Sequence, residues 1–237
     1  MAMAAPSAMT TVTFMHMPMT MTISTITPDA ARLRLAQYLS PAFPVGGFAW
    51  SQGLEWAMDR GAATRATLPQ WLADWLEHGG GWTDGVLVSL SLRPGADHAG
   101  LDDLARATCM GSQRLTETIE QGTAFSANVT ALTGEAHAPA ALPVAFGRAC
   151  AGFPLPAPEM IAAFLQAQAA ALISAAVRFM PLGPVEGQAM LAGLQPTLLA
   201  TAIRAASASE ADLVSATWGA DIAAMSHETM RTRIFRS

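Results

Sequence analysis

The sequence predicts an all-α fold, a single-domain multi-helix bundle with a long apolar central helix. Most segments after residue 30 repeat apolar residues at the three- and four-residue spacing of a helix. One of them, residues 161–177, carries no formal charge. Residues 83–92 contain the run V-L-V-S-L-S-L, which alternates like a strand. Because it has no second strand to pair with, we expect a helix there too.

Composition indicates a globular protein that buries surface against partners. Of its 237 residues, 51% are apolar and 13% are charged, and the mean hydropathy is +0.31. Since this is high for a soluble monomer, we expect an oligomer. The net charge is −5 and all the cationic residues are arginines. Without a basic stripe, nucleic acid is not an expected partner.

The cysteines and the N-terminus favour the cytoplasm. Cys109 and Cys150 stand far apart and in no C-x-x-C spacing, as is typical of reduced thiols. No signal peptide pattern is visible, since the first basic residue is Arg32. Residues 161–177 are short for a membrane span and contain glutamines and a serine, so we interpret them as part of a core helix. No membrane contact is expected.

We divide the chain into a disordered methionine- and threonine-rich leader, residues 1–29, and one helical domain, residues 30–237, whose part 220–237 is a partner-docking tail. The M-H-M-P-M-T-M run of the leader could alternatively hold a soft ion such as Cu(I). Periodicity and turn residues predict the helices of the domain. They are expected at residues 30–39, 67–78, 83–92, 101–121, 124–133, 138–152, 159–180, from the break at 181–184 to 205, and 209–217.

Residues 39–53, which we call the elbow, are predicted to be rigid and non-helical. Two prolines hold the chain extended, and Gly46 and Gly47 allow backbone angles closed to other residues. Ser51 is then expected to cap a short helix that ends at Gly61. Thr67 is expected to form a capping box with Gln70 in the next helix.

The elbow is either a structural turn or a contact surface. Its polar residues Ser51 and Gln52, with Glu55 just after them, stand beside aromatic residues such as Trp50, a mixture that suits protein contacts. It lacks the G-x-G-x-x-G spacing and the lysine of a phosphate-binding loop, so we set nucleotide binding aside.

Charged residues inside two helices need partners. Arg114 can pair with Glu117 one turn later, and Glu120 follows. We expect these carboxylates on a solvated or interface face, although they could also form half of a metal site. Arg178 and Glu186 flank the break at residues 181–184, where we expect bonds to each other, to backbone carbonyls or to a partner.

The tail combines three arginines, Arg231, Arg233 and Arg236, with Phe235. Arginines beside an aromatic anchor are favoured at interface hot spots, whereas many chain termini are simply frayed.

His227 and Glu228 are an adjacent imidazole and carboxylate. A nickel or zinc site would need two or three further ligands, and the other histidines show no metal-binding spacing. No Ser/His/Asp or Cys/His arrangement is legible. We therefore predict no catalytic residue, no cofactor and no tightly bound metal.

Four segments together resemble the urease accessory protein F family, in order and at about the right separations, over residues 32–237. They are S-P-A-F-P-V-G-G-F-A-W-S-Q-G-L-E, R-L-T-E-T-I-E-Q-G, A-A-V-R-F-M-P-L-G-P-V-E-G-Q and D-I-A-A-M-S-H-E-T-M-R-T-R-I-F-R-S. The resemblance implies an all-helical, homodimeric, non-enzymatic adaptor. It would join the D-type (or H-type) urease accessory protein to the G-type accessory GTPase for nickel insertion into apo-urease.

The resemblance also implies that the tail orders against the D-type protein, and it makes the motif residues candidates for partner binding. These candidates are Pro44, Gly46, Gly47, Trp50, Ser51, Gln52, Glu55, Glu117, Glu120, Arg178, Glu186, Gln188, His227, Glu228, Arg231, Arg233, Phe235 and Arg236. The alternative function is a helical nickel carrier that binds the ion through His227 and Glu228, with help from Glu117 or Glu120.

Overall fold

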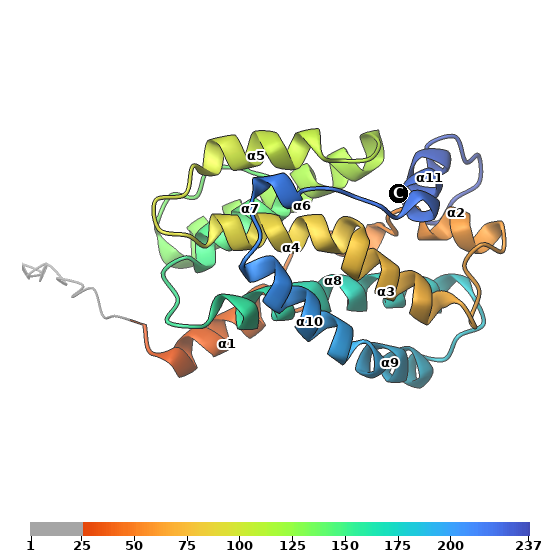
Figure 1. Cartoon of the computed structure of the whole chain (residues 1–237), viewed down its shortest axis with the longest axis horizontal. Coiled ribbons are helices and arrows are strands. Elements are labelled where there is room, and N and C mark those ends of the chain that lie inside the picture. Colours follow the sequence, from red (N-terminus) through yellow and green to blue (C-terminus); the bar gives the residue numbers. More distant parts are fainter. Residues whose placement is uncertain (1–25) are drawn as a thin grey trace, which may run out of the picture.

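A computed structural model describes residues 26–237 of the chain (Figure 1). The leader predicted at residues 1–29, including its methionine-rich run, lies outside the described residues except for its last four. Among these, Thr27 caps the first helix, because its hydroxyl accepts the Ala30 N–H at 3.3 Å. The first helix therefore begins at Pro28, two residues before the helix expected from residue 30.

The described residues form helices and turns only, as the fold class predicts. The α-helices are α1 (Pro28–Tyr38), α2 (Leu54–Asp59), α3 (Leu68–His78), α4 (Gly80–Ser91), α5 (His98–Ala107), α6 (Ser112–Thr133), α7 (Leu142–Cys150), α8 (Ala157–Phe179), α9 (Pro184–Gly193), α10 (Gln195–Ala206) and α11 (Trp218–His227), and the 3₁₀ turns are η1 (Gly47–Ala49) and η2 (Glu210–Asp212).

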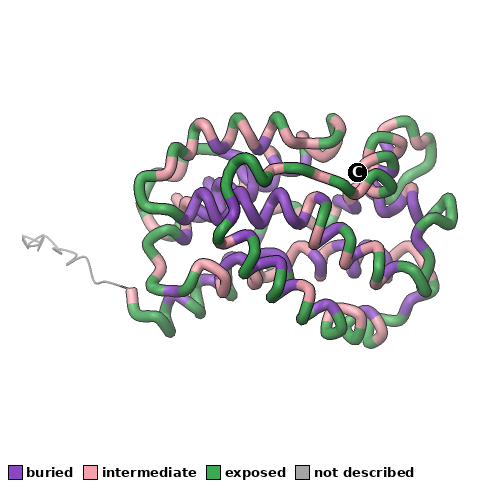
Figure 2. Tube along the Cα trace, in the orientation of Figure 1, coloured by how far each residue is buried: buried purple, intermediate pink, exposed green. Residues whose placement is uncertain are grey.

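Helices α8 and α4 form the centre of the bundle. α8 packs against α10, α4, α9 and α2, whereas α4 packs against α7, α3 and α10. Figure 2 shows buried residues concentrated on these inner helices. Every residue of α4 from Gly81 to Ser91 is buried. The long apolar helix is central as predicted, and the segment that alternates like a strand is a second central helix.

Among the described helices, α8 is long and apolar enough to cross a membrane by length and composition. Half of its most apolar 18-residue stretch is buried inside the bundle. Its small residues Ala169 and Ala176 are fully buried, which lets neighbouring helices approach closely. Core helices of globular proteins have these properties, in agreement with the interpretation of residues 161–177 as a core segment.

One helix predicted from the sequence is two. Residues 101–121 belong to two helices, because α5 ends at Ala107 and α6 begins just after Gly111. α6 also continues through residues 122–123, where a gap between two helices was predicted. Gly111 has φ +108°, a region that favours glycine and stops the helix. The Thr108 hydroxyl also bonds back to the Leu104 carbonyl at 3.0 Å, which competes with helix continuation.

Three further local predictions are wrong. The helix expected to run to residue 205 breaks at Leu194, because Pro196 has no N–H with which to continue it and opens α10 instead. Residues 209–217 form only η2 and a link to α11. The capping box at Thr67 does not form, since its hydroxyl accepts the Thr64 N–H at 2.9 Å.

Gly122 lies where α6 meets the segment that leads into α7. A Cβ atom there would lie 2.0 Å from the Ala140 carbonyl oxygen and 2.6 Å from the Leu142 nitrogen. Because both are backbone atoms, the two elements would have to move apart. We expect Gly122→Ala to lower the free energy of unfolding by about 2 kcal/mol in urea denaturation. Gly152→Ala, where the added Cβ meets nothing within 4 Å, is the control, and equal effects of the two would contradict this packing.

Candidate functional site: the tail and the elbow

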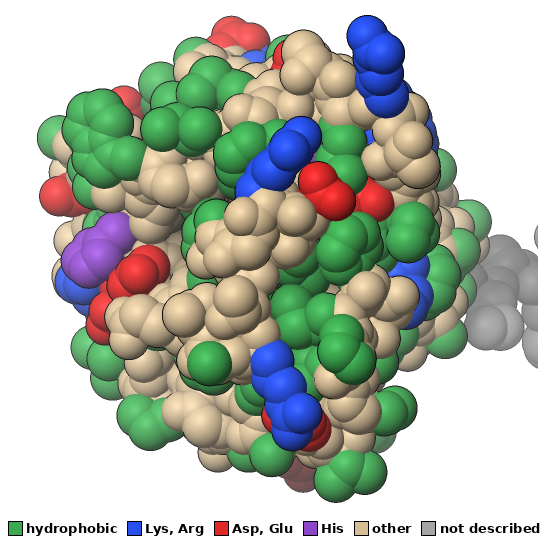
Figure 3. Space-filling view, turned by 90° about the vertical axis from the view of Figure 1, so that its right-hand side faces the viewer, with side chains coloured by type: hydrophobic (Ala, Val, Ile, Leu, Met, Phe, Trp, Pro, Cys, Tyr) green, Lys and Arg blue, Asp and Glu red, His purple; other side chains and the backbone are tan. Residues whose placement is uncertain are grey.

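The tail folds back onto the elbow. After α11, residues 228–237 return to the end of the bundle that carries α2 (Figure 1). Figure 3 looks onto this end, where hydrophobic side chains are interspersed with a few arginines and acidic groups. Phe235 and Ser237 are each only 2% exposed. We call the tail and its receiving surface on the elbow, α2 and α6 the tail site.

Glu55 is the centre of the tail site. Its Oε1 accepts the Ile234 N–H at 2.6 Å, and its Oε2 accepts the Phe235 N–H at 2.9 Å and bonds His227 Nε2 at 2.9 Å. The residue is 1% exposed. A buried carboxylate is tolerated only when such donors replace water. Glu55 therefore binds this chain's own tail, where the sequence suggested an external partner.

His227 connects Glu55 to α6. The ring is fully buried. Both polar atoms of the Gln113 amide find partners in one orientation. The amide nitrogen then donates to His227 Nδ1 at 2.8 Å, and the amide oxygen accepts from Arg233 Nη1 at 2.7 Å. The imidazole then carries its proton on Nε2 and donates it to Glu55. Both ring nitrogens are occupied, so this arrangement leaves neither for a metal ion.

The backbone of the elbow holds the end of the tail. Ser51 donates to the Ser237 carbonyl oxygen through its N–H, at 2.9 Å, and through its hydroxyl. Gln52 N–H donates to Ser237 Oγ at 3.1 Å. Arg236 N–H donates to the Ala49 carbonyl at 2.8 Å. These bonds join residues about 185 positions apart, so only the fold brings them together.

The short helix after the elbow is α2, and its start differs from the prediction. Gly53 occupies the N-cap position, not Ser51. Ser51 still contributes, because its hydroxyl accepts the Glu55 N–H at 3.2 Å. At the other end, Gly61 follows the C-cap Arg60 with φ +71°, the expected conformation for a glycine just after a helix.

Arg178 lies between two aromatic rings of the site. Its guanidinium is 3.6 Å from the Phe48 ring centroid and 4.5 Å from that of Phe235. It also donates to the Phe48 carbonyl at 2.8 Å. Of the partners expected for Arg178, a backbone carbonyl is therefore confirmed. Glu186, the other possible partner, pairs with Arg65 at 2.6 Å.

Arg236 lies at the exposed edge of the tail site. Its guanidinium lies 4.3 Å from the Trp50 ring centroid and pairs with Glu120 at 2.6 Å. The bond from Arg236 lowers the pKa of Glu120. Glu120 is exposed, as predicted, but it faces the tail of its own chain.

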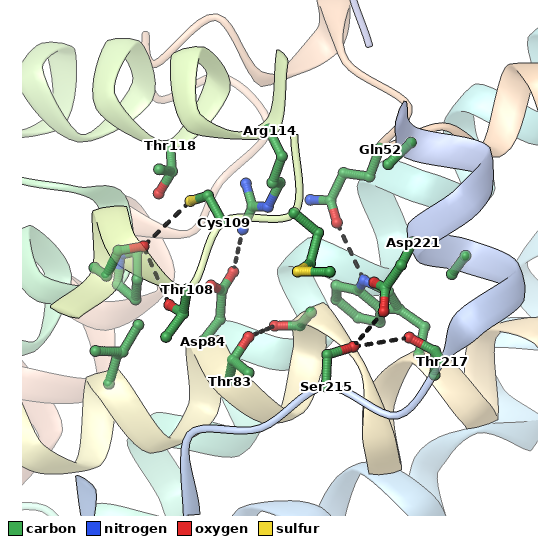
Figure 4. A pocket seen from close by; sticks show the side chains of 18 residues that line it. Gln52, Thr83, Asp84, Thr108, Cys109, Arg114, Thr118, Ser215, Thr217 and Asp221 are labelled. Carbon is green, nitrogen blue, oxygen red and sulfur yellow. Dashed lines mark hydrogen bonds and ion pairs between the residues drawn. The ribbon is translucent and has the colours of Figure 1, made fainter. Parts of the chain in front are cut away.

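A buried charge network lies beside the tail site. Arg114 pairs with Asp84 at 2.6 Å (Figure 4) and with Glu117 at 3.4 Å, so two carboxylates share one guanidinium. Glu117 also accepts from the amides of Gln52 at 3.2 Å and Gln121 at 3.1 Å. Burial raises the pKa of both carboxyls, against the opposing pull of Arg114. The predicted Arg114–Glu117 pair is confirmed, whereas the solvated face is wrong for Glu117, which is buried because α6 turns it into the bundle.

The network faces a cavity of about 50 Å³. Figure 4 shows Asp84 and Arg114 on one side of it and Gln52, Asp221 and Thr217 on the other. Burial raises the pKa of Asp221, and the Ser215 hydroxyl donates to it at 2.9 Å. The space is suited to a few water molecules and is far smaller than the pockets that hold organic ligands.

Six candidates lie apart from these contacts. Glu228 accepts the Ser112 N–H at 2.5 Å and so caps α6. Arg231 is exposed and makes no ion pair within the described residues. Four others line a groove between α1, the elbow and α8. They are Pro44, Gly46, Gly47 and Gln188.

The nickel-carrier alternative finds no preformed site in the described part of the chain. His227 bonds Glu55 and Gln113, whereas Glu228 serves as a helix cap. No group of three or more His, Cys, Asp or Glu side chains among the described residues could hold a metal ion.

Sequence reasoning missed Asp84, Gln113 and Trp75. Asp84 interrupts an apolar helical run, and a lone acid in such a run signals a buried pair. Gln113 and Trp75 carry no comparable signal. Their partners in the site, His227 and Gln52, lie 114 and 23 residues away.

The raised pKa of Glu117 predicts a pH dependence of stability. The folded state keeps this proton at pH values where the unfolded chain has lost it, so unfolding releases protons and stability falls as pH rises through that window. We expect Glu117→Gln to flatten this decline in urea denaturation between pH 5 and 8. Glu120→Gln is the control, because the lowered pKa of Glu120 confines its effect on stability to pH values below about 4.5, so the slope between pH 5 and 8 should stay unchanged. An unchanged slope in Glu117→Gln would contradict the assignment.

The chain is similar in sequence to several known proteins. A family model described as UreF matches residues 62–195. A "Urease accessory protein UreF" from Paracoccus denitrificans is 76% identical over 91% of this chain and all of its own length. Proteins of the same description from Cereibacter sphaeroides and Rhodopseudomonas palustris are 51% and 42% identical, each over 88% of this chain and over 100% and 94% of their own lengths.

The helical bundle and these matches define an accessory protein of urease maturation. Within that class, the chain belongs to the UreF family.

Proposed function

We propose that the chain is a non-enzymatic adaptor that joins the D-type (or H-type) urease accessory protein to the G-type accessory GTPase. The assembly would deliver nickel, as cargo, to apo-urease in the cytoplasm. A scaffold of this kind acts through differential binding, because it shifts a partner between states only by preferring one of them. The adaptor would therefore favour one nucleotide state of the GTPase.

The observation that carries this proposal is the convergence of separate motifs at one end of the bundle. α2 supplies Glu55, α6 supplies Glu120, the end of α8 supplies Arg178 and the tail supplies Phe235 and Arg236. Their contacts build a defined surface from distant parts of the chain. Such a preorganised surface supports binding because its residues lose little conformational freedom on association.

Exposed apolar side chains support binding to other proteins. On α11, Trp218 is 79%, Ile222 51% and Met225 44% exposed, and their spacing puts them on one face of the helix. On the elbow, Phe48 is 71% exposed. Since isolated monomers rarely leave such a stripe uncovered, partner contact or homodimer formation would bury it.

Co-purification from cells that express the D-type protein and the GTPase tests the adaptor role. The full chain is compared with one that ends at Thr232, which keeps α11 and His227 but lacks the contacts of Phe235 and Arg236. We expect the full chain to retain both partners and the shortened chain to lose the D-type protein. Leu33→Ser, at an exposed position of α1, is the control and should retain both.

The opposite result favours the nickel carrier. Equilibrium dialysis that finds about one tightly held nickel ion per chain, together with the absence of both partners in co-purification, would replace the adaptor proposal. Loss of that ion in His227→Ala would then identify the ligand.

A further inference from the structure

Gln52 has an unfavourable backbone conformation. Its φ is +53°, and it is the one non-glycine residue with a positive φ in residues 26–237. Most L residues avoid this region because Cβ crowds the carbonyl oxygen. Where such a residue persists, its surroundings hold it there, and such positions gather at functional sites.

The side chain of Gln52 makes the contacts that hold it. Its Oε1 accepts the Trp75 Nε1–H at 3.1 Å, and its Nε2 donates to Glu117 Oε1 at 3.2 Å. Glu117 in turn pairs with Arg114. Figure 4 shows the Gln52 side chain, with a dashed line from its amide oxygen for the first of these bonds. The amide thus ties the elbow to α3 and α6.

The left-handed turn at Gln52 shapes the receptor for the tail. Successive N–H groups of Ser51 and Gln52 donate to Ser237. The next residue, Gly53, also has a positive φ, and a Cβ there would lie 2.3 Å from the Ala224 nitrogen of α11. The turn therefore presents donors to the tail and lets the backbone of α11 pack directly on the elbow.

We propose that Gln52 is a positioning residue for the tail, whose side-chain amide, anchored to Trp75 and Glu117, holds the elbow in the conformation that receives residues 234–237. Tail docking is thereby coupled to the buried charge network. The coupling operates within the isolated chain, and only its effect on partner capture rests on the proposed function.

Hydrogen exchange of the isolated full chain tests the proposal. The N–H groups of residues 234–236 are bonded to Glu55 and Ala49 and exchange slowly while the tail is docked. We expect Gln52→Ala to raise their exchange rates about tenfold or more, because Ala keeps the unfavourable φ and loses the anchor. Gly and Asn at position 52 tolerate the positive φ but cannot make both hydrogen bonds. The exchange rates of the tail in Gln52→Gly and Gln52→Asn should therefore lie between those of Gln52→Ala and of the parent chain.

Gln70→Ala is the matched control. Gln70 is an exposed glutamine that donates to Asp74 at 2.8 Å, away from the elbow. Its substitution should leave the exchange of the tail unchanged. Circular dichroism confirms that each variant is folded, and the Gly and Asn variants carry the comparison if Gln52→Ala does not fold.

The indole N–H resonance of Trp75, assigned with Trp75→Phe, distinguishes positioning of the tail through the Gln52 amide from a general destabilisation of the fold. Ending the chain at Arg233 should shift this resonance in the parent chain and leave it unchanged in the Gln52→Gly background, because the coupling runs through the amide. A tail that stays protected in all Gln52 variants would overturn the proposal. So would an indole signal that responds equally to tail removal in both backgrounds.

These measurements use no partner protein. If they fail while co-purification succeeds, the role of Gln52 is wrong and the adaptor function stands. If they succeed while co-purification fails, the adaptor function is wrong and the role of Gln52 stands.

Discussion

Glu55→Ala should release the tail and lower the free energy of unfolding by about 3 to 5 kcal/mol, since three buried donors lose their acceptor at once. These donors are the N–H groups of Ile234 and Phe235 and the Nε2–H of His227. The tail can then turn to solvent, but His227 remains in the core without its partner. Urea denaturation measures the loss of stability, and hydrogen exchange of residues 229–237 measures the release of the tail.

Glu120→Ala is the matched control for Glu55. Glu120 also binds the tail, through Arg236, but both side chains of that pair are about half exposed. Surface ion pairs contribute below about 1 kcal/mol because water and salt screen them. If the two alanine variants were equally stable, Glu55 would not be the group that holds the tail.

Arg114→Leu should lower the free energy of unfolding by about 3 to 5 kcal/mol at neutral pH, because it leaves Asp84 and Glu117 buried without a positive charge. The loss should shrink as the pH falls. Protonation removes the charge from the carboxyls, and their pKa values, which burial already raises, rise further when the guanidinium is gone. Urea denaturation at several pH values between 5 and 8 measures both effects.

Arg65→Leu provides the comparison for Arg114. Arg65 forms a similarly short pair with Glu186, at 2.6 Å, but at the protein surface. Its loss should change stability by less than about 1 kcal/mol and without the same pH dependence. A pH-independent effect of Arg114→Leu would show that lost packing, rather than unpaired charge, causes the destabilisation.

The helical class and most helix positions follow from local sequence. The period of the apolar residues predicts α3 and α8, and the break at residues 181–184 follows from its prolines and glycine. Errors arise where a local bond ends a helix, as at Thr108, or where a proline opens a new one, as at Pro196. These signals are present in the sequence, but their effect depends on which of several short-range bonds forms.

The candidate site is predictable only in part. The elbow and the tail stand out by composition, and Glu55, Phe235 and Arg236 do meet there. Their roles differ from the surface roles that the sequence suggested. Glu55 is buried because α2 turns it toward the tail, and Glu117 is buried because α6 turns it toward Arg114.

By itself, the sequence determined the helical fold class, the long core helix and the motifs that mark the UreF family, because these depend on residue type and spacing along the chain. Only the tertiary structure decided that the tail lies on the elbow, that Gln52 bridges Trp75 and Glu117, and that two carboxylates share Arg114. The physical reason is distance along the chain. Residues separated by 23 positions, as Gln52 and Trp75 are, or by more leave no periodic trace in the sequence, and whether a charged side chain is buried depends on which helix packs over it.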